Sequence, residues 1–321
     1  MKLIFIFSLP RSGSTLLQRL LSNHSKVDTA PETWLLFPLL HYKKENTVLT
    51  EYNHLRYTRA VNEFIKSLPY KSEDYERYIK EFVVNIYKCY SSKNKIYFLE
   101  KTPRYYYYAD DIIKIFPDSK FIFLFRNPAS ILGSIINSFG GGRLNHLFGT
   151  YNDLAYGHEF LTNAYDKNKD KALKLNYEEL VSKPEKNLEV ILNYLELGKE
   201  ELLSLTNNEK FFTARLGDKT GIQKYSQISS ESIEKWDEVI INPLRKYLFK
   251  YFIEIIPNKC FEIEGYDRQN ILYRISAKRS HSLKNIWSDL VDIIKTYLKI
   301  KFKLHLFFSK QFSWTHKKYF S

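Results

Sequence analysis

Short apolar segments that alternate with helical patterns constrain the fold of this chain most. Strands separated by helices form right-handed βαβ units with a parallel sheet. We therefore expect an α/β protein with three αβα layers, a central, mostly parallel sheet, and helical insertions. The expected strands are Lys2–Phe7, Ile96–Leu99, Lys120–Phe125 and Leu173–Asn176. Helical patterns are expected over about residues 12–21, 50–90, 104–115 and 184–195, and another helix is expected to begin at Pro128.

Polar or charged segments follow the ends of three of the expected strands. They are Ser8–Thr15, Lys101 and Arg126. Ligands of open parallel sheets bind outside the carboxyl ends of the strands. The sequence therefore predicts a binding site at this edge of the sheet.

The first of these segments has the form of a phosphate-binding loop without its usual lysine. Free backbone N–H groups at a helix start favour phosphate. Aligned on Gly13 with the pattern G-x-x-x-x-G-K-[ST], the chain has Ser14 where the lysine belongs and Thr15 at the last position. A loop of this kind is poorly equipped for γ-phosphoryl transfer, although Arg11 supplies a cation suited to a phosphate.

A second phosphate-binding pattern follows the strand that ends at Phe125. Arg126 closes the strand, and Ser134 lies eight residues further on, about two turns into the next helix. An arginine and a serine placed in this way are suited to a second phosphate of the same ligand.

Together, these motifs resemble the sulfotransferases that use 3′-phosphoadenosine-5′-phosphosulfate (PAPS), in the form of the bacterial and protein-tyrosine branches. The resemblance runs from Lys2 to about Trp236. It implies that a loop binds the 5′-phosphosulfate, that Arg126 and Ser134 bind the 3′-phosphate, that Tyr177 contacts the nucleotide, and that Lys235 reaches a phosphate. The loop residues are Arg11, Ser12, Gly13, Ser14 and Thr15. One position departs from the protein-tyrosine branch, because Ser138 stands where that branch has a basic residue.

The same resemblance implies an in-line transfer to a hydroxyl group. Lys101, with Arg11, would stabilise the leaving phosphate oxygen, and fixed cations of this kind make a metal unnecessary. Glu32, 21 residues after Arg11, would accept the proton of the acceptor, with Trp34 and Phe37 as apolar neighbours. His24 is a weaker candidate for the base. The acceptor is unidentified: a carbohydrate, a lipid, a small molecule or a protein tyrosine.

Positive charge is concentrated at the end of the chain. The last 52 residues contribute +9 of the net charge of +13, and their only acids are Asp289 and Asp292. We expect a body over residues 1–265 and a basic amphipathic extension over 266–321. Three partners fit the apolar face of such an extension: the body itself, a second subunit in a homodimer, or an anionic membrane surface. Nucleic-acid binding is not expected, since nothing places the basic side chains on one face.

Composition excludes several other classes of protein. Two cysteines, Cys89 and Cys260, are too few for a disulfide scaffold. No targeting segment and no membrane span is expected, so a cytoplasmic or membrane-associated protein is predicted.

Two alternatives to the sulfotransferase stay open: a small-molecule kinase, which would need ATP and Mg²⁺, and a non-catalytic protein that binds a membrane or partner through its tail.

Overall fold

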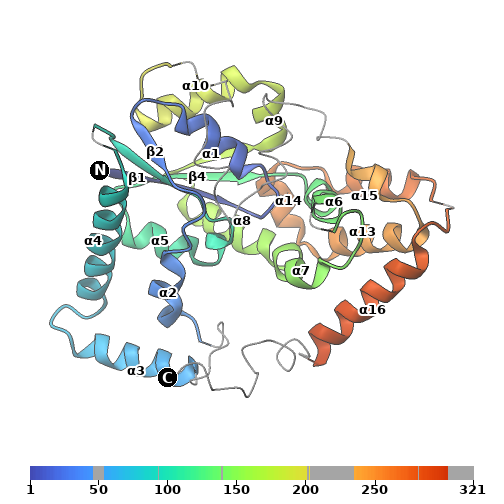
Figure 1. Cartoon of the computed structure of the whole chain (residues 1–321), viewed down its shortest axis with the longest axis horizontal. Helices are drawn as coiled ribbons and strands as arrows, with labels where there is room; N and C mark the ends of the chain where they lie inside the picture. The colour runs from blue at the N-terminus through green and yellow to red at the C-terminus, as the bar shows by residue number, and fades with distance from the viewer. Residues whose placement is uncertain are drawn as a thin grey trace, which may run out of the picture.

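A single parallel sheet lies at the centre of the computed structural model (Figure 1), which describes residues 1–45, 54–92, 94–138, 140–200, 202, 235–280 and 282–302. The strand order is β2-β3-β1-β4-β5, and every neighbouring pair is parallel. The strands are β1 (Lys2–Ser8), β2 (Val27–Thr29), β3 (Tyr97–Glu100), β4 (Lys120–Phe125) and β5 (Ala172–Asn176). The predicted three-layer α/β fold is confirmed.

The two faces of the sheet bury different kinds of side chain, because successive residues of a strand point to opposite faces. Ile4 and Ile6 of β1 lie in an aliphatic layer with three helices. These are α1 (Ser14–Ser22), α9 (Tyr177–Ser182) and α10 (Pro184–Leu195), which lie above the sheet in Figure 1. Both faces of a parallel sheet need such a cover.

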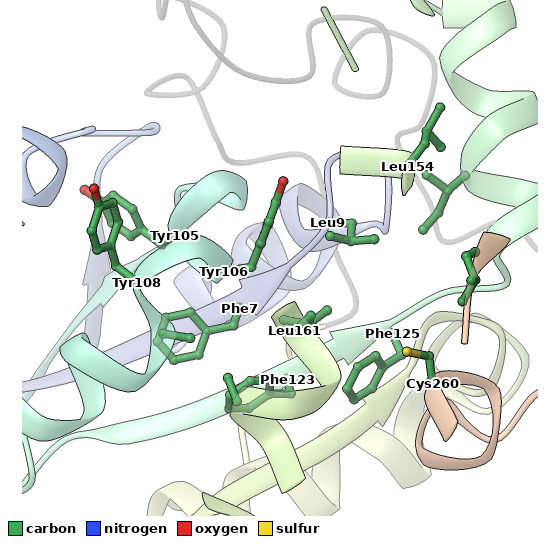
Figure 2. Close-up of a cluster of buried hydrophobic side chains, with 14 of the residues drawn as sticks. Phe7, Leu9, Tyr105, Tyr106, Tyr108, Phe123, Phe125, Leu154, Leu161 and Cys260 are labelled. Carbon is green, nitrogen blue, oxygen red and sulfur yellow. The ribbon is translucent and has the colours of Figure 1, made fainter. Parts of the chain in front are cut away.

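Aromatic side chains fill the opposite face. Phe7 and Phe123 have ring centroids 5.0 Å apart, and Phe125 and Leu161 continue this layer (Figure 2). The covering elements are η2 (Pro103–Tyr108), α4 (Ser72–Tyr90), α5 (Ala109–Ile115), α6 (Pro128–Ser138), α8 (Gly157–Asn168) and α13 (Pro243–Ile255).

The remaining described elements are α2 (Leu36–Leu40), η1 (His41–Lys43), α3 (His54–Ser67), α7 (Leu147–Ala155), η4 (Lys235–Val239), α14 (Asn258–Glu264), α15 (Arg268–Ala277) and α16 (Ile286–Phe302). The four strands expected from the sequence are present, and β4 and α10 have the predicted bounds. Strand β2 was not predicted, because it is only three residues long and has Asp28 at its centre.

The described part of the basic extension packs against the body. Ile271 and Ile275 of α15 are buried in the same core cluster as Phe249 of α13. Helix α16 contacts α7 and α13. The division of the chain at residue 265 stays a prediction.

Candidate active site

The loop between β1 and α1 turns sharply at Gly13. Its φ of +89° lies in the left-handed region that favours glycine, and helix α1 begins at the next residue, Ser14. A Cβ atom at Gly13 would lie 2.2 Å from Cδ2 of Tyr177, which begins α9. The absence of a side chain therefore allows the ring of Tyr177 to rest directly on the loop.

Arg126 lies against this loop, because β4 pairs with β1. Its Nη1 donates a hydrogen bond of 2.7 Å to the carbonyl oxygen of Arg11, and its guanidinium lies 4.3 Å from the centroid of the Tyr177 ring. Burial lowers the pKa of Arg126. A bound anion would stabilise the charged form of this buried cation.

The side chain of Arg11 extends to helix α6. Its Nε donates to Ser134 Oγ at 3.1 Å, and its Nη2 donates to Ser138 Oγ at 2.9 Å. The two predicted phosphate-binding segments therefore contact each other directly. The guanidinium of Arg11 also occupies the surroundings of Ser138, where the sequence lacks a basic residue.

Lys101 and Glu32 form an ion pair beside the same loop. Lys101 Nζ donates to Glu32 Oε1 at 3.0 Å and to Thr15 Oγ1 at 3.2 Å. The lysine side chain is only 2% exposed, and Trp34 Nε1 donates to the other carboxylate oxygen of Glu32 at 3.3 Å. The structure thus brings the predicted base, the predicted leaving-group cation and the loop together.

Gln18 of α1 holds the segment that carries Glu32. Its Nε2 donates to Thr29 Oγ1 at 2.7 Å and to the carbonyl oxygen of Ala30 at 2.8 Å. Thr29 in turn donates to the carbonyl oxygen of Leu99 at 2.7 Å. These hydrogen bonds hold the short strand β2 and the residues after it against α1 and β3, which brings Glu32 back to the loop.

Glu100 is a functional candidate that the sequence analysis missed. Its buried carboxylate accepts hydrogen bonds from Thr33 (3.0 Å), Tyr87 (2.8 Å) and Thr102 (2.8 Å). Burial raises the pKa of Glu100 to about 6, against the opposing effect of these donors and of Lys101. Its position at the end of β3, directly before Lys101, was a signal that could have identified it.

Ser8 and Ser12 add two buried hydroxyl groups to the loop. Neither Oγ atom has a hydrogen-bond partner among the described residues. Buried hydroxyl groups of this kind are normally satisfied by a partner or a ligand. These groups, the loop amides and the cations Arg11, Lys101 and Arg126 fit a ligand with more than one anionic group.

The segment that contains Lys235 also lies next to Ser134. A Cβ atom at Gly133 would lie 3.1 Å from Cα of Trp236, so α6 and η4 are packed backbone to backbone. The preceding loop, Gly217–Ser230, lies outside the described residues. His24 lies elsewhere: its Nε2 is 3.0 Å from the carbonyl oxygen of Gly198, beyond the end of α1.

Comparison with known proteins identifies the family of this chain. The family model described as "Sulfotransferase family" matches residues 4–201, more than half of the sequence. The chain belongs to the sulfotransferase family.

Two curated relatives and one solved structure extend this finding. The sulfotransferase chain is 26% identical over 142 residues to nodulation protein NoeE of Sinorhizobium fredii, covering 42% of this chain and 31% of the relative. It is 24% identical over 251 residues to a protein-tyrosine sulfotransferase of Drosophila melanogaster, covering 74% of this chain and 47% of the relative. It thus spans less than half of the length of each.

The sulfotransferase domain from the curacin biosynthetic pathway has the same fold. It superimposes with a TM-score of 0.55 at 22% identity, over 83% of this chain and 98% of that domain.

Proposed function

We propose that this protein transfers a sulfuryl group from PAPS to a hydroxyl group of an acceptor. One observation carries the proposal: Arg11 and Arg126, which come from two separate predicted phosphate-binding segments, lie in direct contact. The hydrogen bond from Arg11 to Ser134 joins the same two segments. A ligand with two anionic groups, a 3′-phosphate and a 5′-phosphosulfate, fits this arrangement.

The roles we assign follow from the resemblance to PAPS-dependent sulfotransferases and, for Arg126, Ser134 and Tyr177, also from observed contacts. Arg126, Ser134, Tyr177 and Lys235 bind the nucleotide, and the backbone amides from Ser12 to Thr15 bind its 5′ end. Arg11 belongs to the first segment and donates to Ser134 and Ser138 of the second, so its guanidinium is within reach of both phosphates.

Lys101 and Glu32 act as a coupled pair in this proposal. Glu32 accepts the proton of the acceptor hydroxyl and becomes neutral. Its attraction for Lys101 Nζ, 3.0 Å away, then weakens. Lys101 is thereby released to donate to the leaving phosphate oxygen, so that proton removal and charge stabilisation occur together.

The side chains beside Glu32 support an acceptor with an apolar face next to its hydroxyl group. Trp34 and Phe37 are half-buried, and their ring centroids lie 5.1 Å apart. The name of the Drosophila relative includes one such acceptor, protein tyrosine. Other phenols fit the same surroundings.

Ligand-dependent thermal stability tests the proposed donor. Adenosine 3′,5′-bisphosphate should raise the unfolding temperature of the full chain more than ATP with Mg²⁺ does, because a ligand that binds only the folded state stabilises it. Adenosine 5′-phosphate is the matched control, since it lacks the 3′-phosphate that Arg126 and Ser134 would bind. A stronger effect of ATP with Mg²⁺ would favour the kinase alternative.

A further inference from the structure

Helix α16 docks on the body through its acidic side chains. Asp289 is fully buried and accepts hydrogen bonds from Arg245 Nε at 2.7 Å, Arg245 Nη2 at 2.9 Å and Asn242 Nδ2 at 2.7 Å. Asp292 is also buried, and Arg143 Nη2 donates to it at 3.1 Å. Both acids of the last 52 residues are therefore paired with arginines of the body.

The outward face of α16 is apolar. Trp287, Val291, Ile294 and Leu298 follow each other at intervals of four, three and four residues, which places them in one stripe along the helix. All four are exposed, Trp287 to 78%. A helix of a globular protein normally turns such a stripe toward the core, and here it faces away from it. In Figure 1, α16 lies at the edge of the molecule.

Lysines flank this stripe. Lys284, Lys295, Lys299 and Lys301 are exposed, whereas the two acids of the segment face the body. The outward surface of residues 282–302 therefore combines bulky apolar side chains with positive charge and presents no carboxylate.

We propose that the outward face of α16 binds an anionic lipid surface. Insertion of Trp287, Val291 and Ile294 among the acyl chains would bury their apolar area, while the flanking lysines contact acidic headgroups. Because the carboxylates are paired with arginines of the body, they do not oppose this attraction.

Charge and composition favour lipid over protein as the occupant. Protein interfaces are depleted in lysine. A second copy of the chain would bring the same lysines face to face across a two-fold axis, which is electrostatically unfavourable. Among the described residues, no helix has the length and apolar character needed to cross a bilayer. The geometry therefore corresponds to a helix that lies in the membrane surface.

Vesicle flotation of the full chain tests the proposal. We expect binding to vesicles of phosphatidylcholine mixed with phosphatidylglycerol, and much weaker binding to phosphatidylcholine alone. Raising the salt from about 0.1 M to about 1 M should release the protein, because the Debye length falls from about 10 Å to about 3 Å. Equal binding to both kinds of vesicle would overturn the electrostatic part of the proposal.

A double variant tests the apolar stripe. Val291→Asp with Ile294→Asp should lower the apparent affinity for anionic vesicles by at least about tenfold. The matched control is Tyr78→Asp with Phe82→Asp, two exposed side chains of α4 that also lie about one helical turn apart, which should leave binding unchanged. An equal loss in both variants, or none in the first, contradicts the assignment.

Tryptophan fluorescence gives a readout that does not depend on a disruptive variant. Anionic vesicles should shift the emission of the protein to shorter wavelength, and Trp287→Phe should remove that shift while preserving flotation. Sedimentation without lipid tests whether a second copy of the chain covers this face instead. If the parent protein is a dimer and the double variant Val291→Asp with Ile294→Asp is a monomer, the face is a self-interface and the proposal is overturned.

Discussion

The buried carboxyl group of Glu100 links the positions of the proposed catalytic residues. It accepts hydrogen bonds from Thr33 and Thr102, which directly follow Glu32 and Lys101 in the sequence. Hydrogen bonds from such neighbours fix the local backbone and with it the direction of the adjacent side chains. We therefore assign Glu100 a positioning role.

The pKa of Glu100 predicts how stability depends on pH. Burial raises this pKa from 4.5 to about 6, so the folded state holds the proton more tightly than the unfolded state. The contribution of Glu100 to the free energy of unfolding is therefore largest below pH 4.5 and declines by about 2 kcal/mol as the pH rises to above 6.

Urea unfolding of Glu100→Gln and the parent protein across this pH range measures the effect. The stability of the parent minus that of the variant should fall by about 2 kcal/mol between pH 4.5 and pH 7. Glu189→Gln, on the exposed face of α10, is the control and should give a curve parallel to that of the parent. If the difference in stability between the parent and Glu100→Gln is the same at every pH, the pKa of Glu100 is not raised.

Separate losses of turnover and of nucleotide affinity test the roles of four site residues. Glu32→Gln and Lys101→Ala should lower turnover by roughly 10²–10⁴-fold, with adenosine 3′,5′-bisphosphate affinity changed only modestly. Arg126→Ala and Ser134→Ala should mainly weaken binding of this nucleotide, by roughly tenfold or more. Calorimetric titration and sulfation kinetics measure both quantities. A similar loss of affinity in all four variants would refute the division of roles.

At the scale of elements, the loop between β1 and α1 depends on the packing of α9. The left-handed turn at Gly13 and the ring of Tyr177 occupy positions that exclude any larger residue. Because Tyr177 also stacks on Arg126, one contact surface joins the ends of β1, β4 and β5.

Gly13→Ala tests this packing. The substitution meets both an unfavourable φ of +89° and a contact of 2.2 Å with Tyr177, so we expect a loss of stability of about 2–4 kcal/mol. Adding Tyr177→Ala should restore the part that comes from the steric contact, whereas the backbone strain stays. Urea unfolding of the two single variants and the double variant separates these parts. If the loss of stability in the double variant equals the sum of the losses in the two single variants, the ring of Tyr177 does not rest on Gly13.

At the scale of the whole molecule, ion pairs attach the basic extension to the body. Arg245 and Asp289 are both nearly inaccessible to solvent, and Arg245 Nη2 also donates to the carbonyl oxygen of Gly142 at 2.6 Å. Breaking a buried pair on one side leaves an uncompensated charge, which costs far more than breaking an exposed pair.

Arg245→Met should therefore destabilise the protein by about 3–5 kcal/mol. Arg245→Met with Asp289→Leu should recover much of this loss, because no buried charge is left unpaired. Lys167→Met removes the exposed partner of Asp110 and serves as the control, with a near-zero effect expected.

Chemical denaturation also tests the division at residue 265, since an independent extension would unfold in an earlier, separate transition.

The sequence by itself determined four of the five described strands, the order of most α and β segments and the motifs of the site. These features depend on short-range patterns: apolar runs such as Lys120–Phe125, a glycine at a sharp turn, and polar residues directly after strand ends. Parallel pairing then brings the ends of β1, β3 and β4 to one edge, which is why Arg11, Lys101 and Arg126 were found in one place.

Only the tertiary structure decided which side chains meet. The hydrogen bond from Arg11 to Ser134 spans 123 residues, and the pairing of Asp289 with Arg245 spans 44. Such contacts depend on how helices pack across the sheet, and no local pattern encodes that packing. The direction of α16 has the same cause. Its periodicity identifies an apolar stripe, but Arg245 and Arg143 of the body pair with the acidic face, and the stripe is left facing outward.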